Sequence, residues 1–380
     1  MRLDEIRKDI DVVDSKILEL FEERMNLSLE VAKTKKTDSI AVSHPSREKE
    51  ILHRISEKIG EPLDGYARIL FNTLFDLSRS CQNDYLSRVS DLNSRIEKAI
   101  LDTPKLFPKK AVVACQGVEG SYSQAACEKL FEVPSTMYFN SFEGVFNGVD
   151  KGLCQYGILP LENSSYGSVG TVYDLMENYD FHIVKSIRLR ISHSLLANPS
   201  TRIEDIKEIF SHEQAIGQCG EFLKTLKDVK ITICENTARA AKMVSESGRN
   251  DVAAICSREC ILLYGLEAIK NNIQGTDNNY TRFICISKKL EIYPGANKIS
   301  LMLSLPHKPS SLYHMIARFA ALGVNLTKLE SRPVAGSDFE FMFYFDMEAS
   351  VYSQELINLL SQLEYQPEQF VFLGSYSEVI

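Results

Sequence analysis

The stretch Asn278-Asn279-Tyr280-Thr281-Arg282-Phe283 leads into the apolar run Phe283-Ile284-Cys285-Ile286, and it decides how the middle of this 380-residue chain is organised. The β-branched and aromatic side chains of the run predict a buried strand. Alternate side chains of a strand point to opposite faces, so Thr281 and Phe283 are expected on one face and Arg282 on the other. A hydroxyl and a guanidinium at the mouth of a buried strand suit a small carboxylate ligand. By itself, the stretch favours a threonine bonded to its own backbone and an arginine in a surface ion pair, and the rest of the chain changes this interpretation.

Five segments around this strand repeat one pattern, which is a short apolar run, a polar turn and a helix. The runs are Ala111–Cys115, Tyr156–Leu161, Ile206–Phe210, Val229–Cys234 and Val252–Cys256. Such repeats predict a parallel sheet whose faces are covered by helices. The polar turns of a parallel sheet meet at the carboxyl ends of its strands, where helix N-termini favour anions. No turn has the spacing of a dinucleotide fingerprint or a Walker A loop, so a phosphate-bearing cofactor is not expected.

Length and composition limit the class of protein. A chain of this length is expected to form two or three domains, and its 44% hydrophobic and 25% charged residues are normal for a globular protein. The net charge of -8 argues against nonspecific binding to nucleic acid. Nine dispersed cysteines without a CxxC pair indicate free thiols in a reducing cytosol, and no apolar run is long enough for a membrane span. We therefore expect a cytoplasmic protein with small-molecule partners and with neither nucleic-acid nor membrane partners.

Apolar residues recur at steps of three and four near the N-terminus and predict one amphipathic helix from about residue 2 to 36. The stripe consists of Leu3, Ile6, Ile10, Val13, Ile17, Leu20, Leu27 and Val31. A helix roughly 50 Å long cannot bury this stripe alone, so a partner helix or a second protomer is implied.

Arg24 occupies a position where the stripe calls for an apolar residue, and a buried charge is unfavourable unless an anion meets it. Lys35 lies about three turns further on the same face. Arg7 lies roughly 100° around the helix and about 25 Å away, so one small ligand cannot touch all three residues within one chain. An antiparallel dimer could bring Arg7 of one protomer to Arg24 and Lys35 of the other.

A second helix is predicted after Pro45, and a third is predicted from about residue 64 to 101. Residues 1–90 resemble the all-helical chorismate mutases. The positions that carry the resemblance are Arg7, Arg24, Lys35, Arg47, Glu48, Ser78 and Gln82. The alternative is a solvated coiled coil whose basic residues pair with its glutamates.

The resemblance implies how these residues act on chorismate. Arg7 and Arg24 clamp its carboxylates, and Lys35 and Gln82 face its ether oxygen. Glu48 accepts the substrate hydroxyl, while Arg47 and Ser78 support binding. The rearrangement to prephenate is unimolecular, so the enzyme has only to hold the reactive shape and stabilise charge on the breaking bond.

Residues 91–109 comprise the end of the third helix and a proline-containing linker, and residues 110–290 form the next predicted domain. This region resembles the prephenate dehydratases, which fold as two α/β lobes with the ligand between them. The blocks that carry the resemblance are Gly117-x-x-Gly120-Ser121-Tyr122-Ser123, Glu162-Asn163-Ser164, Ser211-His212, Glu235-Asn236-Thr237 and Thr281-Arg282-Phe283.

The dehydratase reaction removes carbon dioxide and hydroxide from prephenate and leaves an aromatic ring. Thr281 is the family's key hydroxyl, and we interpret it as a hydrogen-bond donor to the leaving hydroxyl because threonine is too weak an acid to release a proton. Residues that orient the substrate or complete a relay are implied at Glu162, Asn163, Ser164, Ser211, Gln218 and Glu235. Arg282 and Phe283 would bind carboxylate and pack the ring, although strand alternation turns Arg282 away from Thr281.

Two histidines in this region are not assigned to catalysis. His212 is explained at least as well as the cap of its own turn. His193 lies in the strand-like segment Ile191–Leu196 and is expected to be a paired core residue.

Residues 297–380 read as strand, helix, strand, strand, helix and strand, an order that predicts a ferredoxin-like α+β domain. The block Glu330-Ser331-Arg332-Pro333 resembles the ACT regulatory domain of prephenate dehydratases. The resemblance implies a phenylalanine effector bound at an interface between two such domains, with Ser311 and Leu312 at the start of the first helix. The family usually has Gly-Ala-Leu where this chain has Ser310-Ser311-Leu312, and the added side chains could weaken or alter effector binding. The alternative is a domain that serves only for dimerisation.

The sequence thus favours a multidomain, bifunctional enzyme of phenylalanine biosynthesis. It would combine an isomerase, chorismate mutase, with a lyase, prephenate dehydratase, and phenylalanine would inhibit it as an allosteric effector. No cofactor or metal is expected, because neither step is redox and no ligand cluster appears in the sequence. We expect a homodimer or a larger homo-oligomer. The alternative is a ligand-binding sensor with a helical dimerisation domain; Thr281 and the set Arg24, Lys35 and Gln82 favour the enzyme.

Overall fold

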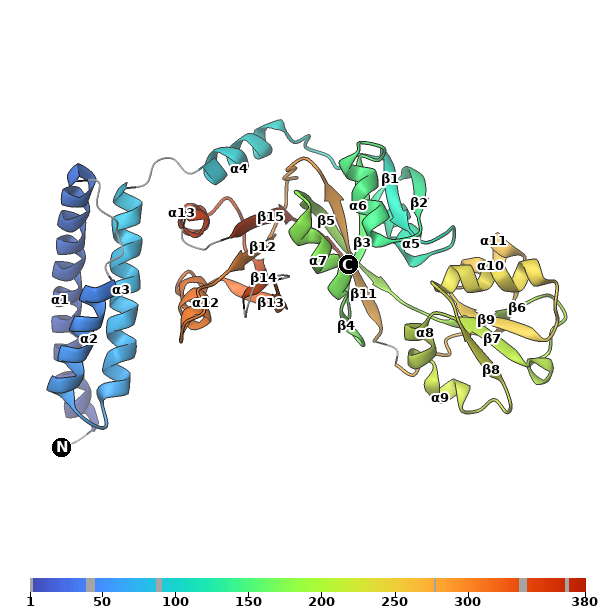
Figure 1. The fold of residues 1–380 in the computed structure, drawn as a ribbon, viewed down its shortest axis with the longest axis horizontal. Helices are drawn as coiled ribbons and strands as arrows, with labels where there is room; N and C mark the ends of the chain where they lie inside the picture. The colour runs from blue at the N-terminus through green and yellow to red at the C-terminus, as the bar shows by residue number, and fades with distance from the viewer. Residues whose placement is uncertain (1–2, 39–44, 87–90, 277, 335–339, 366–368) are drawn as a thin grey trace. The chain divides into compact units, whose positions relative to one another are not determined.

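The computed structural model describes residues 3–38, 45–86, 91–276, 278–334, 340–365 and 369–380 (Figure 1). The chain divides into two compact units. One unit comprises residues 1–95, 305–324 and 352–370, and the other comprises residues 96–304, 325–351 and 371–380. Within the described residues, no helix is both long enough and apolar enough to span a bilayer.

The first unit is helical. Its helices are α1 (Leu3–Asp38), α2 (Pro45–Ile59), α3 (Asp64–Leu86), α12 (Ser311–Ala321) and α13 (Gln354–Tyr365), and helix α4 (Asp91–Asp102) begins in it. The first two predicted helices are confirmed. The third, predicted over residues 64–101, is found as α3 and α4, and residues 87–90 between them lie outside the described residues.

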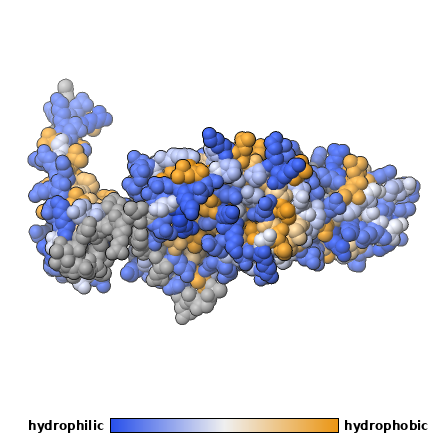
Figure 2. Space-filling view, turned by 90° about the horizontal axis from the view of Figure 1, so that it is seen from above, coloured by the Kyte–Doolittle hydropathy of each residue, from blue (hydrophilic) through white to orange (hydrophobic). Residues whose placement is uncertain are grey.

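The apolar stripe of α1 faces outward. All eight of its residues are more than a third exposed, although α1 packs beside α3. Apolar side chains are visible among polar ones along the N-terminal helices at the left of Figure 2. Exposed apolar area of this extent on one helix is expected at an interaction surface, which agrees with the predicted need for a partner.

The second unit contains a lobe built on a mixed sheet in the order β16-β5-β11-β3-β1-β2, with β4 beside β3. The strands are β1 (Lys110–Gln116), β2 (Val133–Phe139), β3 (Tyr156–Asn163), β4 (Gly167–Ser168), β5 (His182–Arg190), β11 (Tyr280–Ser287) and β16 (Glu378–Val379). Helices α5 (Tyr122–Leu130), α6 (Phe142–Asp150) and α7 (Gly170–Asn178) cover its faces. Strands β2, β4, β5 and β16 and helix α6 were not predicted from the sequence.

A second lobe follows, with the sheet order β10-β6-β9-β7-β8. The strands are β6 (Ser194–Ala197), β7 (Glu208–Ser211), β8 (Lys230–Ile233), β9 (Val252–Cys256) and β10 (Glu267–Lys270). Helices α10 (Thr237–Ser247) and α11 (Cys260–Tyr264) cover one face, and α8 (Glu213–Gln218) and α9 (Gly220–Leu223) cover the other. The strand-like segment Ile191–Leu196 becomes strand only from Ser194.

The five runs predicted to form a parallel sheet do pair parallel, since β1 pairs with β3 and β7 pairs with β8 and β9, but they lie in two sheets, and each sheet also contains antiparallel strands. Strand β11 pairs antiparallel with both β3 and β5, and β6 pairs antiparallel with β9 and β10. The physical reason is the chain path, because β11 re-enters the first lobe after the second lobe is complete and therefore runs against its neighbours. The predicted alternation along β11 is present: Ile284 and Ile286 pack into one core, and Phe283 and Cys285 pack into the other.

A third sheet has the order β13-β14-β12-β15 and also belongs to the second unit. Its strands are β12 (Lys298–Ser304), β13 (Asn325–Pro333), β14 (Phe341–Glu348) and β15 (Phe370–Tyr376). With α12 and α13, the chain order is the predicted βαββαβ, and the strand order is that of a ferredoxin-like sheet. The alternating residues Phe339, Phe341, Phe343 and Phe345 predict the third strand, which the structure describes from Phe341 as β14, and Phe339 lies outside the described residues.

This third sheet packs against the first lobe through a buried ion pair. The guanidinium of Arg282 on β11 contacts the carboxylate of Asp346 on β14, and the two residues are only 5% and 1% exposed. Ser300 donates a second hydrogen bond to the same carboxylate. Apolar residues Tyr173 and Ile284 of the lobe share one core with Tyr344 of the sheet.

We predict that Asp346→Ala lowers the free energy of unfolding by about 3–5 kcal/mol, because the buried guanidinium of Arg282 loses the more deeply buried of its two carboxylate partners. The matched control is Asp150→Ala, which breaks an exposed pair with Lys288 and should change stability by less than about 1 kcal/mol. Urea denaturation followed by circular dichroism measures both. Equal effects of the two substitutions would contradict the assigned importance of the buried pair.

Candidate functional site

A cleft of about 260 Å³ opens between the two lobes of the second unit. Its lining includes five of the residues predicted from sequence to act on prephenate: Asn163, Gln218, Glu235, Thr281 and Phe283. Thr281 and Phe283 both line the cleft, as alternation along β11 predicts. The structure therefore brings together residues that are more than 100 positions apart in the chain.

The Thr281 hydroxyl is held by its neighbour on β3. The pairing of β11 with β3 places Thr281 opposite Asn163, next to a register shift at Arg282 and Phe283. Asn163 Nδ2 lies 2.9 Å from Thr281 Oγ1 and donates a hydrogen bond to it. Thr281 is 9% exposed, so this hydroxyl is at the edge of the cleft and not on an open surface.

His193 and Gln218 form a second polar contact in the cleft. The Nε2 atom of His193 lies 2.7 Å from Gln218 Oε1, which also accepts a hydrogen bond from Asn279 Nδ2 at 2.8 Å. Burial lowers the pKa of His193 more than its bond to Gln218 raises it. The expectation that His193 is buried and paired is confirmed, but sequence reasoning missed that it lines the cleft and offered no signal for it.

Three helices begin at the cleft wall, and the residues that cap them line it. Ser121 accepts a hydrogen bond from the backbone N–H of Gln124 at the start of α5, and Asn236 does the same for Arg239 at the start of α10. His212 caps α8 by accepting from the N–H of Gln214, which confirms its interpretation as a cap. Helix N-termini favour anions, so this wall suits a substrate that carries carboxylates.

Four residues predicted for this site do not line the cleft. Ser211 is fully buried and donates a hydrogen bond to the Ile255 carbonyl. Ser164 Oγ donates to the Asn278 carbonyl and accepts from the backbone N–H of Tyr280. Glu162 and Arg282 lie on the other face of their strands and contact each other at 3.3 Å. These side chains support the cleft wall in this structure and do not form its surface.

Glu162 belongs to the contact with the third sheet. Lys328 Nζ on β13 lies 2.7 Å from Glu162 Oε2 and 2.8 Å from Ser168 Oγ. Burial alone would raise the pKa of Glu162, but the positive charges of Arg282 and Lys328 outweigh it and lower this pKa. Glu162 is therefore a carboxylate that neutralises cations beneath the cleft.

Part of the predicted mutase set comes together on α1 and α3. Arg24 donates hydrogen bonds to the Leu74 carbonyl, at 2.8 Å, and to Ser78 Oγ. Burial lowers the pKa of Arg24. Gln82, one turn beyond Ser78, is buried, and its Oε1 has no hydrogen-bond partner among the described residues. A buried acceptor of this kind is unfavourable unless a donor meets it, which is consistent with a ligand at this place.

The other mutase positions stay apart in one chain. Arg7 is 66% exposed and contacts Asp4, and Arg47 contacts Glu50 at 2.7 Å on the surface of α2. Glu48 is paired with Arg79. The side chain of Lys35 lies outside the described residues. Both Arg7 and Arg24 lie on α1, and the helix separates them by about 25 Å, so one small ligand cannot contact both within one chain.

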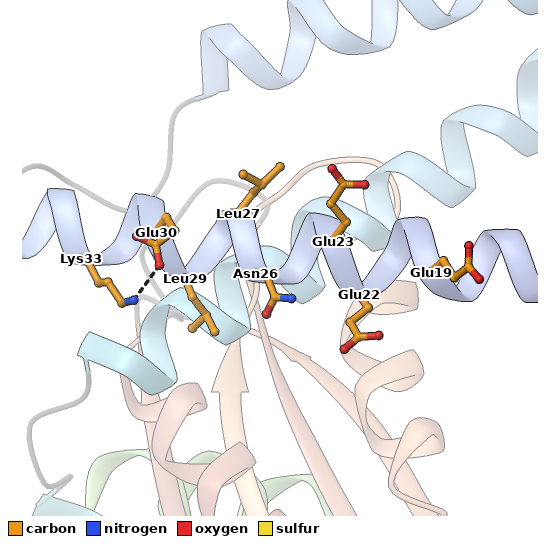
Figure 3. A pocket seen from close by; sticks show the side chains of 8 residues that line it. All are labelled: Glu19, Glu22, Glu23, Asn26, Leu27, Leu29, Glu30 and Lys33. Atoms are coloured by element: carbon orange, nitrogen blue, oxygen red, sulfur yellow. Dashed lines mark hydrogen bonds and ion pairs between the residues drawn. The ribbon is translucent and has the colours of Figure 1, made fainter.

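A larger hollow, of about 620 Å³, lies along α1 and is shown in Figure 3. Its labelled side chains all come from α1, and four of the eight are glutamates: Glu19, Glu22, Glu23 and Glu30. Lys33, the cation among these eight side chains, is paired with Glu30 at 2.6 Å. This surface repels a dicarboxylate, so it does not fit the substrate implied for the helical domain.

The predicted effector residues lie in two elements. Ser310 precedes α12 with a φ of 70°, a left-handed conformation that favours glycine, and Ser311 and Leu312 begin the helix. On β13, Glu330 accepts a hydrogen bond from Ser168 at 2.8 Å and Arg332 pairs with Asp174 at 2.9 Å, while Ser331 and Pro333 belong to the same strand. The serine that replaces the family's usual glycine thus keeps a glycine-like backbone.

The described residues include no group of three or more histidine, cysteine, aspartate or glutamate side chains that could hold a metal ion.

Comparisons with known proteins match two parts of the chain to two families. Residues 6–83 match chorismate mutase type II, and residues 113–291 match prephenate dehydratase. The bifunctional chorismate mutase/prephenate dehydratase of Escherichia coli (strain K12) is 30% identical over 381 residues, which are 98% of this chain and 95% of that protein.

Two further relatives cover the dehydratase part. The chloroplastic arogenate dehydratase/prephenate dehydratase 2 of Arabidopsis thaliana is 34% identical over 322 residues, which are 78% of this chain and 84% of that protein. The crystal structure of a prephenate dehydratase from Arthrobacter aurescens in complex with L-Phe superposes with a TM-score of 0.64 at 26% identity, over 70% of this chain and 89% of that chain.

Proposed function

The chain belongs to the family of bifunctional chorismate mutases/prephenate dehydratases, and on this premise we propose which of its residues carry the two reactions. It is an enzyme of phenylalanine biosynthesis that rearranges chorismate to prephenate and then converts prephenate to phenylpyruvate with loss of carbon dioxide and water. The observation that carries the proposal is the buried Thr281 hydroxyl, which lies at the edge of the cleft and accepts a hydrogen bond from Asn163.

We assign the dehydratase step to this cleft. Thr281 donates a hydrogen bond to the departing hydroxyl of prephenate, which stabilises the charge that develops on that oxygen. The helix N-termini at the wall bind the carboxylates, and Phe283 packs the ring. Glu235 is the acidic side chain that the described residues contribute to the lining, and it would orient the substrate or take part in proton transfer.

Within the same proposal, Glu162, Ser164, Ser211 and Arg282 act indirectly. Ser164 holds the start of β11 through the backbone at Tyr280, and Glu162 and Arg282 fix the underside of the strands that carry Asn163 and Thr281. Their effect on the reaction would pass through the position of these two side chains.

The mutase step is assigned to the α1 and α3 surface that carries Arg24, Ser78 and Gln82. Arg24 binds a carboxylate of chorismate, and Gln82 and Lys35 face the ether oxygen. Arg7, Arg47 and Glu48 complete the site. The exposed stripe of α1 supports a homodimer in which Arg7 of a second protomer reaches this site, because one chain leaves Arg7 on the surface.

The C-terminal βαββαβ region is proposed to be an ACT regulatory domain that binds phenylalanine. Its support is the strand order, the Glu330-Ser331-Arg332-Pro333 block and the relative whose crystal structure contains L-Phe. Contacts of Glu330 and Arg332 with the dehydratase lobe offer a path by which effector binding reaches the cleft. The nine free cysteines support a reducing, cytoplasmic location.

We predict that Thr281→Ala lowers the rate of phenylpyruvate formation by about 100-fold, because the departing hydroxyl loses its donor. Thr281→Ser keeps the hydroxyl and should retain most of the rate. Absorbance of phenylpyruvate measures the reaction. A rate for Thr281→Ala within about threefold of the unmodified protein would refute the role of this residue, since it corresponds to under 1 kcal/mol of barrier.

We predict that Arg24→Ala lowers kcat/KM of the mutase step by about 100-fold, or about 2.7 kcal/mol, because a substrate carboxylate loses its partner. The dehydratase rate with added prephenate should not change, since that site is elsewhere. Arg68→Ala on the exposed face of α3 is the matched control. Equal mutase rates in the Arg24 and Arg68 variants would remove Arg24 from the site.

We predict that millimolar phenylalanine lowers the dehydratase rate, and that Ser310→Gly strengthens this inhibition because it restores the backbone freedom that the family usually has there. Steady-state rates with and without phenylalanine measure both effects. A dehydratase rate that does not respond to phenylalanine would count against the regulatory assignment.

A further inference from the structure

A chain of side-chain hydrogen bonds runs from Thr281 into the second lobe. Asn163 Nδ2 contacts Thr281 Oγ1 at 2.9 Å and Asn279 Oδ1 at 2.8 Å. Asn279 Nδ2 contacts Gln218 Oε1 at 2.8 Å, and this oxygen contacts His193 Nε2 at 2.7 Å. Asn279 is only 1% exposed and His193 only 2%, whereas Asn163 and Gln218 are partly exposed where they line the cleft.

The direction of the chain is set at Asn163. The backbone N–H groups of Ser165 and Tyr166 lie 2.9 and 3.0 Å from Asn163 Oδ1. A backbone N–H group can only donate, so the atom that it faces has to be the amide oxygen. The amide nitrogen of Asn163 therefore faces Thr281, Asn279 and, at 3.3 Å, the Tyr280 carbonyl.

The donor and acceptor roles of the remaining residues follow from the orientation of Asn163. Because Asn279 Oδ1 accepts from Asn163, its Nδ2 group is the donor to Gln218 Oε1. Gln218 Oε1 can only accept, so the Nε2 atom of His193 carries a hydrogen. The other ring nitrogen, Nδ1, lies 3.5 Å from the hydroxyl of Tyr122, which itself donates to the Ser192 carbonyl at 2.6 Å.

These contacts fix the role of the Thr281 hydroxyl, which accepts a hydrogen bond from Asn163 and donates its own hydrogen elsewhere. A hydroxyl has one hydrogen, and Thr281 Oγ1 already accepts from Asn163, so its hydrogen is left to donate to another group. The cleft is where Thr281 is accessible. If the Asn163 amide turned over, its oxygen would attract this hydrogen and the substrate would lose it.

We propose that Asn279 and His193 are positioning residues of the dehydratase site, which act through Gln218 to add to the two backbone donors in holding the Asn163 amide nitrogen on Thr281, so that the Thr281 hydroxyl hydrogen is directed at the departing hydroxyl of prephenate. The proposal rests on the role of Thr281 given above. A chain of amides does not carry protons, so these residues orient the donor and do not supply the proton.

The test compares two substitutions of His193. His193→Leu removes the donor to Gln218, and we expect kcat for prephenate to fall about tenfold with KM changed by less than about twofold. His193→Gln places an amide donor near the Nε2 position and should restore most of the loss. The matched control is His182→Leu, a buried histidine of β5 outside the cleft, which should lower stability without changing kcat.

A double-mutant cycle separates this proposal from the proposed role of Thr281. In a Thr281→Ala background, His193→Leu should cause no further loss, because its effect passes through Thr281. Equal losses in both backgrounds, a change in KM alone, or no rescue by glutamine would overturn the positioning role. Full activity of Thr281→Ala by itself would instead overturn the assignment of Thr281.

Nitrogen-15 NMR of the histidine rings in the unmodified full chain gives a readout that does not depend on any variant folding. We expect His193 to be the neutral tautomer with its hydrogen on Nε2 at pH 7. A hydrogen on Nδ1 alone would reverse the direction of the chain and overturn the proposal.

Discussion

Arg282 follows Thr281 on β11, and its side chain is buried on the opposite face of that strand. The charge of its guanidinium is paired with the carboxylate of Asp346 on another sheet. Because alternate residues of a strand face opposite ways, the same backbone that presents Thr281 to the cleft drives Arg282 into the interior. The interior accepts this charge only with paired acids, which Asp346 and Glu162 supply. The position of β11 in its sheet and the packing of the third sheet on the first lobe therefore depend on the same buried ion pairs.

The two proposed sites handle negatively charged substrates in different ways. The proposed dehydratase cleft offers helix N-termini and polar side chains, and Arg282, the cation next to Thr281 on β11, is turned away from it. The mutase surface depends on arginines, and its hollow on α1 is acidic. A cleft between two lobes can be completed by one chain, whereas the exposed apolar stripe beside the proposed mutase site is the reason for our proposal that a second chain covers it.

Sequence reasoning about site residues succeeded where local chemistry decides the outcome. Asn163, Gln218, Glu235, Thr281 and Phe283 all reach the cleft, and His212 caps its own helix. Strand alternation indicated that Arg282 faces away from Thr281, but it did not reveal that Arg282 pairs with Glu162 and with Asp346 of a third sheet, because these partners are distant in sequence. Asn279 precedes the Thr281-Arg282-Phe283 block, and His193 lies outside all of the motif blocks. Only the tertiary structure connects them to Thr281 through hydrogen bonds.

The amino-acid order alone determined most of the elements of this protein, since helix periodicity, apolar runs and turn residues are local properties. It predicted α1 and α2, the βαββαβ order and the strand that carries Thr281. The direction in which β11 enters its sheet was decided only in the tertiary structure, because the antiparallel pairing depends on where the chain returns after completing the second lobe. The polarity of the bonds that reach Thr281 was decided there as well, since it starts from two backbone amides in a turn of the opposite strand.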